Sequence, residues 1–572
     1  MRGLSSSDVK SKKSLIYPIA IAGIVGLSLL SGAILNAFSG KDNLSTDGLC
    51  PILPIKAPVS FLKDNSTVLS ILHDKEFREK SAEKLAKAVQ VDTVVFDSPP
   101  EPDENPEYWT KFLKFHQYLR DTFPTVHSTL KLDKVNTYGL VFTWEGTNPD
   151  LKPIMLTAHQ DVVPVQQDSL GKWTHPPFEG YYDGEYLFGR GSCDCKNVLT
   201  AIMESLELLI AQDFKPERTV IAAFGMDEES GGLVGARHIG EFLEERYGVD
   251  GIYAIIDEGF PFSLEPQSGV FMATPLVSEK GMATIKSQLQ TPGGHSSMPP
   301  DHTSIGMISE LVYLLENNPF EPLLTSKNPT LNMLQCVATH FGDKLPPSYR
   351  EAILKADYDT KSNQIVVDAL QKDVATRYFI RTSQAVDIIK GGEKANALPE
   401  AVTLTVNHRI ALESSIKEIV DRFMKYAKIV AVKYNLGLNL EGTPVIDSEG
   451  KFGILDVTLD GSKLEPVEPS PSDDTVWEYL AGVSRHLMHD LIKPDLEYDF
   501  VVTPMVMQAN TDTARYHHLT KSIFRYSPSL GQMINFHSID ERLEFDAHLH
   551  LIAFFFEYLQ TIDTPDAENQ KL

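Results

Sequence analysis

Residues 219–229 read Thr-Val-Ile-Ala-Ala-Phe-Gly-Met-Asp-Glu-Glu, a short apolar run that is followed by acidic side chains. An apolar run of this length, closed by a glycine, predicts a buried β-strand. Two neighbouring carboxylates, Glu228 and Glu229, come just after it. Neighbouring carboxylates repel each other and persist best where a cation compensates them, although a solvated acidic loop is the alternative interpretation. The stretch therefore predicts a strand with a candidate site at its end.

Strands and helices alternate on both sides of this stretch. Residues 153–158 and 252–256 are strand-like, and residues 197–212 and 232–247 have the apolar spacing of helices. This alternation predicts an α/β domain with a mixed, largely parallel sheet, whose ligands bind at the carboxyl ends of the strands. The residues that follow the predicted strand ends are His159, Glu228, Glu229 and Asp257.

The composition and the pattern of predicted elements change after about Glu279. Residues 284–290 and 401–410 read as strands, residues 304–316 and 414–435 as helices, and a segment rich in Lys, Asp and Pro runs to Thr376. Residues 500–507 and 549–559 resemble the first domain again. This order predicts an inserted α+β lid domain at 279–455, between two parts of a catalytic domain at 61–278 and 456–572.

Composition supports a globular protein of more than one domain. The chain has 572 residues, of which 42% are hydrophobic and 23% are charged, and this length is too great for one ordinary core. Its formal net charge is -26. Phosphate binding needs clustered Lys and Arg, so no nucleic-acid partner is expected.

An uncharged segment near the N-terminus predicts a membrane anchor. Residues 15–38 contain no charged side chain. As a helix this segment would span roughly 36 Å, enough for a bilayer core of about 30 Å, whereas the apolar region of a cleaved signal peptide, the alternative, is shorter. Basic residues precede it, which predicts a cytosolic tail at 1–14, one transmembrane helix at 15–38 and a stalk at 39–60. Everything beyond would lie on the lumenal side.

Two Asn-X-Ser/Thr sequons, at Asn43 and Asn65, follow the predicted anchor. Both are candidate glycosylation sites, and both agree with the lumenal topology.

The four cysteines are Cys50, Cys193, Cys195 and Cys336, and their spacing forms no recognisable disulfide framework. Because Cys193 and Cys195 flank Asp194, one of them could be a thiolate ligand. Carboxylates and imidazoles already complete a site, which disfavours this interpretation.

Five residues spread along the chain are of the kinds that zinc accepts as ligands: His159, Asp194, Glu229, Asp257 and His537. Asp194 lies in a glycine-rich turn before a predicted helix, where a carboxylate could bridge two metal ions. Taken alone, Asp194 would be read as a helix cap and His159 as a core histidine. Asp161 can orient His159, and Glu228 can take a proton from water.

Five motifs occur in an order that resembles the M20 family of metallopeptidases. They are Leu156–Val165 (LTAHQDVVPV), Gly189–Lys196 (GRGSCDCK), Asp227–Gly232 (DEESGG), Gly293–Ser297 (GGHSS) and His537–Glu541 (HSIDE). The resemblance runs from about Asn65 to near the C-terminus. Within the family, the chain is similar to membrane-anchored vacuolar carboxypeptidases of fungi.

The resemblance implies two zinc ions per subunit. One would be held by His159, Asp194 and Asp257, and the other by Asp194, Glu229 and His537. Glu228 would be the general acid/base, and Asp161 would orient His159.

The resemblance also assigns roles to the lid. His295 is implied to stabilise the oxyanion and, in dimers of the family, to come from the partner subunit. Asn396 matches a residue that contacts substrate, and Arg409 lies near a basic position. Asn510 departs from the pattern, since relatives usually have glycines before Thr-Asp.

The function implied is a carboxypeptidase that releases C-terminal amino acids from short Gly-X peptides in the vacuolar lumen. It would act as a type II membrane protein, retained or released by clipping, with a homodimer formed through the lid. An N-acyl-amino-acid hydrolase or synthase on the same metals is an alternative, because both cleave an amide beside a free α-carboxylate. An inactive membrane-anchored binding protein is a third, opposed by the intact Glu228, ligand set and His295.

Overall fold

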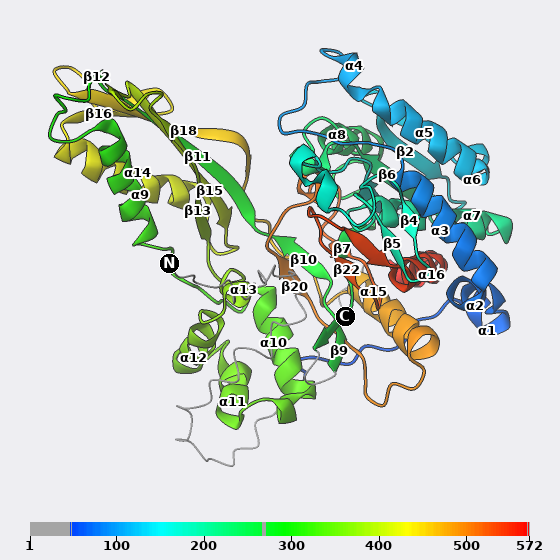
Figure 1. The fold of residues 1–572 in the computed structure, drawn as a ribbon. Coiled ribbons are helices and arrows are strands. Elements are labelled where there is room, and N and C mark those ends of the chain that lie inside the picture. Colours follow the sequence, from blue (N-terminus) through cyan, green and yellow to red (C-terminus); the bar gives the residue numbers. More distant parts are fainter. Residues whose placement is uncertain (1–45, 47, 266–269, 569, 571–572) are drawn as a thin grey trace, which may run out of the picture.

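The computed structural model describes residues 46, 48–265, 270–568 and 570. They form a catalytic domain and a lid that projects from it (Figure 1). The predicted tail at 1–14, the transmembrane helix at 15–38 and Asn43 lie outside the described residues. Within the described ranges, no helix has both the length and the apolar character needed to cross a membrane.

The catalytic domain is built on an eight-stranded sheet of order β1-β2-β6-β3-β7-β21-β10-β20. Strands β6, β3, β7 and β21 run parallel, and β10 runs parallel to β20, while the pairs β1/β2, β2/β6 and β10/β21 are antiparallel. The expected mixed α/β sheet is therefore confirmed. The strands are β1 (Lys131–Val135), β2 (Gly139–Trp144), β3 (Ile154–His159), β6 (Val220–Gly225), β7 (Ala254–Phe260), β10 (Leu276–Glu279), β20 (Met505–Met507) and β21 (Ile523–Tyr526).

Both faces of this sheet are buried, because alternate residues of its strands enter two different cores. In β6, Val220, Ala222 and Phe224 join the core under α7 and α16, whereas Ile221 and Ala223 join the core under α8. A strand buried on both faces needs an uninterrupted apolar run, and residues 220–224 supply one. The helices around the sheet are α3 (Lys75–Val89), α5 (Lys111–Thr122), α7 (Lys196–Ala211), α8 (Ala236–Tyr247), α15 (Thr475–His486) and α16 (Phe545–Thr561).

The lid is a six-stranded sheet of order β13-β15-β11-β18-β16-β17, with α9 and α14 packed on one face. Burial alternates along β15, so the sheet has one apolar face. The sheet continues through Leu464, later than the boundary expected at 455. Its elements are β11 (Gly281–Gln290), β13 (Ser383–Gly391), β15 (Ala401–Ile410), β16 (Leu436–Leu440), β17 (Thr443–Ile446), β18 (Gly453–Leu464), α9 (Ser304–Glu316) and α14 (Ile416–Lys433).

A helical segment inside the expected lid range packs on the catalytic domain instead. Its helices are α10 (Pro329–His340), α11 (Pro347–Lys355), α12 (Thr360–Leu370) and α13 (Val374–Arg377). The helices α10, α11 and α12 share a hydrophobic core with Leu276 of β10, Met505 of β20 and Cys50. The sequence predicted only a segment rich in Lys, Asp and Pro here. Its first helix, α10, packs against β20 at the edge of the central sheet, and α11 and α12 pack into the same core (Figure 1).

The segment expected to be a stalk lies against the catalytic domain from Cys50 onward. Cys50 forms a disulfide with Cys336 of α10. Lys56 forms an ion pair of 2.8 Å with Glu478, and its N–H donates to the carbonyl of Gly482 at 3.1 Å. The expectation of no disulfide framework is corrected here, because the pairing joins residues 286 positions apart and only tertiary packing brings them together.

Loss of the Cys50–Cys336 disulfide should destabilise the protein. The bond links residues 286 positions apart, and its loss should lower the free energy of unfolding by about 2–5 kcal/mol. Thermal unfolding of the wild type with and without reductant, beside Cys336→Ser, measures this. The Tm of the variant should equal that of the reduced wild type, and reductant should not change it. A variant as stable as the oxidised wild type would contradict the role of the bond.

Candidate metal centre

The metal-ligand candidates come together at the carboxyl edge of the central sheet. His159 is the last residue of β3, Glu228 and Glu229 lie in a single 3-10 turn (Glu228–Ser230) after β6, and Glu258 lies in β7. Asp194 precedes α7. His537 comes from the loop between β22 (Met533–Ile534) and β23 (Arg542–Glu544). Three groups of these residues could hold a metal ion: His159 with Asp194, Cys195 and Glu258; His159 with Glu228 and Glu229; and Asp194 with Glu229 and His537.

Asp194 lies between two histidines. Its Oδ1 is 3.0 Å from Nε2 of His159, and its Oδ2 is 3.0 Å from Nε2 of His537. Nε2 of His537 is also 3.1 Å from Oε2 of Glu229. One carboxylate that directs its two oxygens to two different imidazoles has the arrangement expected of a bridge between two metal ions.

Asp161 organises the site through more than His159. The side chain of Asp161 is fully buried, and Nδ1 of His159 is 3.0 Å from its carbonyl oxygen and 3.4 Å from its Oδ1. Its Oδ1 and Oδ2 accept the backbone N–H groups of Glu228 and Glu229, each at 3.1 Å. Asp161 therefore fixes the turn that presents both glutamates, a role that the sequence did not reveal.

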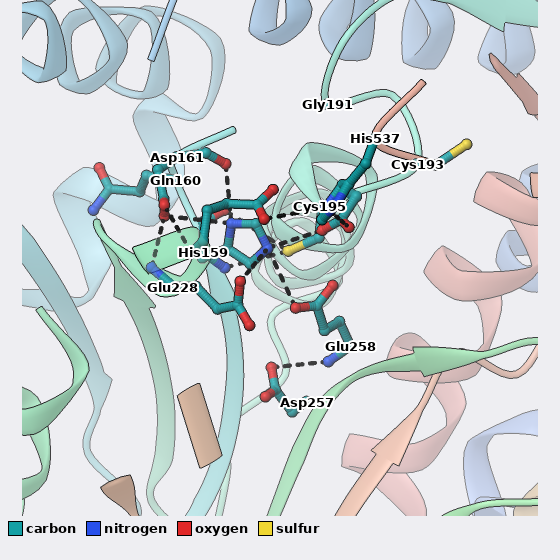
Figure 2. Close-up of polar contacts among 12 residues, drawn as sticks. His159, Gln160, Asp161, Gly191, Cys193, Cys195, Glu228, Asp257, Glu258 and His537 are labelled. Atoms are coloured by element: carbon teal, nitrogen blue, oxygen red, sulfur yellow. Dashed lines mark hydrogen bonds and ion pairs between the residues drawn. The ribbon is translucent and has the colours of Figure 1, made fainter. Parts of the chain in front are cut away.

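Glu258 faces the centre, whereas the expected ligand Asp257 does not (Figure 2). Oε1 of Glu258 is 3.2 Å from Nε2 of His159. Oδ1 of Asp257 instead accepts the N–H of Glu258 at 2.8 Å. The strand β7 continues through Phe260, past its expected end at 256, and successive side chains of a strand point to opposite faces. The structure thus differs from the expectation by one residue of strand register.

Glu541 ties the loop of His537 to the loop of Asp194. Its Oε1 accepts the N–H groups of Gly191 and Cys193, both at 3.0 Å, and its Oε2 pairs with Arg190 at 2.5 Å. It is fully buried. Its place in the motif His537–Glu541 was the only sequence signal, and the motif alone did not show which residue it contacts.

The two free cysteines are buried beside Asp194. The sulfur of Cys195 accepts the N–H of His159 at 3.3 Å, and the sulfur of Cys193 contacts the carbonyl oxygen of Arg542 at 3.1 Å. Burial raises the pKa of both thiols well above the usual value. Cys195 is close enough to share a ligand group, but its contacts are those of a thiol that supports the backbone of His159.

The charge balance of the cluster fits bound cations. Burial raises the pKa of Glu228 well above its usual value, an effect that His159 opposes and that Glu258 and Glu229 reinforce. Burial and the charge of Asp194 raise the pKa of Glu229 to about 7, and its Oε1 is buried without a hydrogen-bond partner among the described residues. Four carboxylates around two imidazoles are a donor set that suits divalent metal ions.

The lid residues fall into two places. His295 lies in β12 (Gly294–His295), which pairs with β14 (Ala397–Leu398) next to Asn396, and both residues are exposed at the outer end of the lid, far from β7 (Figure 1). Arg409, in β15, lies at the base of the lid. Its Nη1 donates to Oδ1 of Asn510 at 2.7 Å. Burial lowers the pKa of the guanidinium, an effect that the charges of Glu228 and Glu279 oppose. One chain thus places Arg409 where the lid meets the catalytic domain, and His295 and Asn396 at the outer end of the lid.

Comparison with known proteins identifies the family of this chain. The sequence model of peptidase family M20/M25/M40 matches residues 155–561. Carboxypeptidase S of Saccharomyces cerevisiae is 44% identical over 502 residues, covering 87% of this chain and 86% of that protein. The bovine N-fatty-acyl-amino acid synthase/hydrolase PM20D1 is 30% identical and covers 86% of this chain and 89% of that protein.

Solved structures share the fold. The di-peptidase Dug1p of Saccharomyces cerevisiae has a TM-score of 0.58 at 14% identity, and covers 87% of this chain and 99% of that one. The metallo-carboxypeptidase Sso-CP2 of Sulfolobus solfataricus has a TM-score of 0.56 at 14% identity, and covers 84% of this chain and 99% of that one. With five motifs in order, the two-domain fold and a relative at 44% identity, the chain belongs to the M20 family of metallopeptidases.

Proposed function

We propose that this protein is a zinc-dependent carboxypeptidase that releases C-terminal amino acids from short peptides of the Gly-X type. The observation that carries the proposal is the set of carboxylates and imidazoles around Asp194, together with the guanidinium of Arg409 at the base of the lid, where it donates to Asn510 at 2.7 Å. A guanidinium beside a hydrolytic centre suits the free carboxylate of a peptide's last residue. The 44% identity to carboxypeptidase S supports the same substrate class.

Two zinc ions would be held around Asp194. His159, Asp194 and Glu258 form one ligand group, and Asp194, Glu229 and His537 form the other. When bound, such ions supply Lewis-acid chemistry, which polarises the scissile carbonyl and lowers the pKa of water.

The chain's own residues would carry the proton and orient the substrate. The carboxylate of Glu228 is 3.8 Å from Nε2 of His159 at its closest oxygen, and it makes no closer contact to a cation among the described side chains. It is therefore available to take a proton from water and to return it to the leaving amine. Asp161 holds the backbone of Glu228 during both transfers.

A second function, hydrolysis or synthesis of N-acyl amino acids, has support from the relatives named N-fatty-acyl-amino acid synthase/hydrolase, which are 30–31% identical. The same centre and the same carboxylate contact would serve it. The lower identity makes the peptide substrate the first proposal.

We place the enzyme in the vacuolar lumen, held by the segment at 15–38. The Cys50–Cys336 disulfide supports a compartment that permits disulfides. Asn65 is exposed at the N-cap of α2 (Ser66–His73) and makes no side-chain capping hydrogen bond, so a glycan could be attached there.

Parallel assays of an N-blocked Gly-Leu dipeptide and a fatty-acyl amino acid test the proposed function. The wild type should hydrolyse the dipeptide with the higher kcat/KM, and a chelator should abolish the activity. Glu228→Gln should retain its metal yet lose nearly all turnover, because it removes the proton acceptor and spares the ligands. A clear preference for the fatty-acyl substrate would favour the second function, and chelator-resistant activity would refute a metal enzyme.

The isosteric pair Glu258→Gln and Asp257→Asn tests the ligand register in β7. Glu258→Gln should lose about one of two zinc equivalents in elemental analysis, since one ligand group would lack its charge. Asp257→Asn should keep both ions. The opposite pattern, with circular dichroism unchanged in both variants, would return the ligand role to Asp257.

A homodimer through the lid would explain the position of His295. Nδ1 of His295 is 2.7 Å from the hydroxyl of Ser297 and accepts the N–H of Ser297 at 3.2 Å. With Nδ1 occupied as an acceptor, the neutral imidazole carries its proton on Nε2, which can act as a donor. We propose that this donor stabilises the oxyanion at the centre of the partner subunit.

Mixing two inactive variants measures this sharing. His295→Ala should cut kcat by about 100-fold while leaving metal content intact. Random re-association with Glu228→Gln chains should restore roughly a quarter of wild-type activity, because about half of the dimers would be mixed and each would hold one complete site. A monomer with full activity, or a mixture no more active than its parts, would rule the shared site out.

A further inference from the structure

The lid base meets the catalytic domain at Asn510. Asn510 follows β20 and lies between Arg409 of the lid and Lys280, the residue that connects β10 to β11. Oδ1 of Asn510 accepts from Nη1 of Arg409 at 2.7 Å, and its Nδ2 donates to the carbonyl oxygen of Lys280 at 2.8 Å. The amide therefore joins β15 of the lid to the connection between β10 and β11.

We infer that Asn510 is a positioning residue that holds the guanidinium of Arg409 in the orientation needed to bind the C-terminal carboxylate of the substrate. This inference rests on the proposed function, because it assumes that Arg409 receives this carboxylate.

The contacts to Arg409 and to Lys280 require one acceptor and one donor in the same side chain, which an amide provides. The guanidinium of Arg409 can only donate, and the carbonyl of Lys280 can only accept. Asparagine satisfies both at once, with its oxygen toward Arg409 and its nitrogen toward Lys280. An aspartate would place a carboxylate oxygen against the carbonyl of Lys280, and it would also neutralise the charge of Arg409. A glycine would leave Arg409 without this partner.

The support behind Asn510 is rigid. Lys280 is almost fully buried, and its Nζ donates to the carbonyl oxygens of Tyr378 at 3.0 Å and Arg381 at 2.7 Å. These carbonyls belong to the segment that leads from α13 to β13. The helical segment on the catalytic domain thereby fixes Lys280, Lys280 fixes the amide of Asn510, and the amide fixes Arg409.

Arg409 keeps capacity for a ligand. Among the described residues, its guanidinium makes one side-chain hydrogen bond, the one to Asn510. The other N–H groups can form the paired contacts that guanidinium makes with carboxylate. A long side chain loses rotamer freedom when it binds, and a fixed partner reduces that loss.

A selectivity measurement tests the inference. The probes are an N-blocked Gly-Leu dipeptide and its C-terminal amide, compared as the ratio of their kcat/KM values in the full-length enzyme. Asn510→Ala should raise KM for the free acid about 10-fold with kcat nearly unchanged, and should leave the amide unaffected, as expected for loss of one orienting hydrogen bond. Asn510→Asp should lower the selectivity ratio further, because its charge competes with the substrate carboxylate.

Two controls separate the possible failures. Gln508→Ala is the matched control: it lies in the same loop and donates to the carbonyl of Ala375 at 3.1 Å, without contacting Arg409. It should leave the selectivity ratio unchanged. Arg409→Ala should collapse the ratio; if it does not, the proposed carboxylate contact is wrong. If Arg409→Ala collapses the ratio while Asn510→Ala matches the wild type, or if Asn510→Ala lowers kcat equally for acid and amide, the positioning role of Asn510 is overturned.

Discussion

The catalytic centre depends on one carboxylate that lies between two histidines, one from each of the two parts of the catalytic domain that flank the lid in the sequence. The carboxylate oxygens of Asp194 lie 3.0 Å from Nε2 of His159, at the end of β3, and 3.0 Å from Nε2 of His537, in the loop between β22 and β23. Such a contact requires the loop before α7 and the loop before β23 to be fixed against each other. Glu541 does this by accepting backbone N–H groups of the Asp194 loop from the buried end of the His537 loop. The two parts of the catalytic domain therefore close on the same cluster, although the whole lid is inserted between them.

Burial gives this cluster its chemistry. Buried carboxylates that face one another are unfavourable as anions, which is why the pKa of Glu228 and that of Glu229 are raised. Divalent cations would remove that cost and leave Glu228, which has no short cation contact, as the group that exchanges protons. The lid supplies the residues that are proposed to contact the substrate. Arg409 lies at the base of the lid and donates to Asn510, whereas His295 lies at the opposite end of the lid, so the oxyanion role proposed for His295 would need a second subunit (Figure 1).

Much of this arrangement could be read from the sequence, and the rest could not, for identifiable reasons. The apolar run at 220–224 and the alternation around it predicted the doubly covered sheet, and the motif order predicted His159, Asp194, Glu229 and His537 as neighbours. Asp257 and Glu258 are adjacent in the chain, so a strand that ends four residues later than expected changes which of them faces the centre. The Cys50–Cys336 disulfide and the contacts of Glu541 join residues far apart in sequence, which no local pattern encodes. The helices α10–α13 lie in a segment that is rich in Lys, Asp and Pro overall, and this composition masked the apolar residues of α10, α11 and α12 that meet in one core.

The central claim is that two metal ions bind on either side of Asp194. A crystal structure of the zinc-loaded enzyme, with anomalous scattering measured at the zinc absorption edge, tests it most directly. Two anomalous peaks should flank the carboxylate of Asp194, one in contact with His159 and Glu258 and the other with His537 and Glu229. A single peak, or peaks that leave Asp194 without a metal contact, would contradict it.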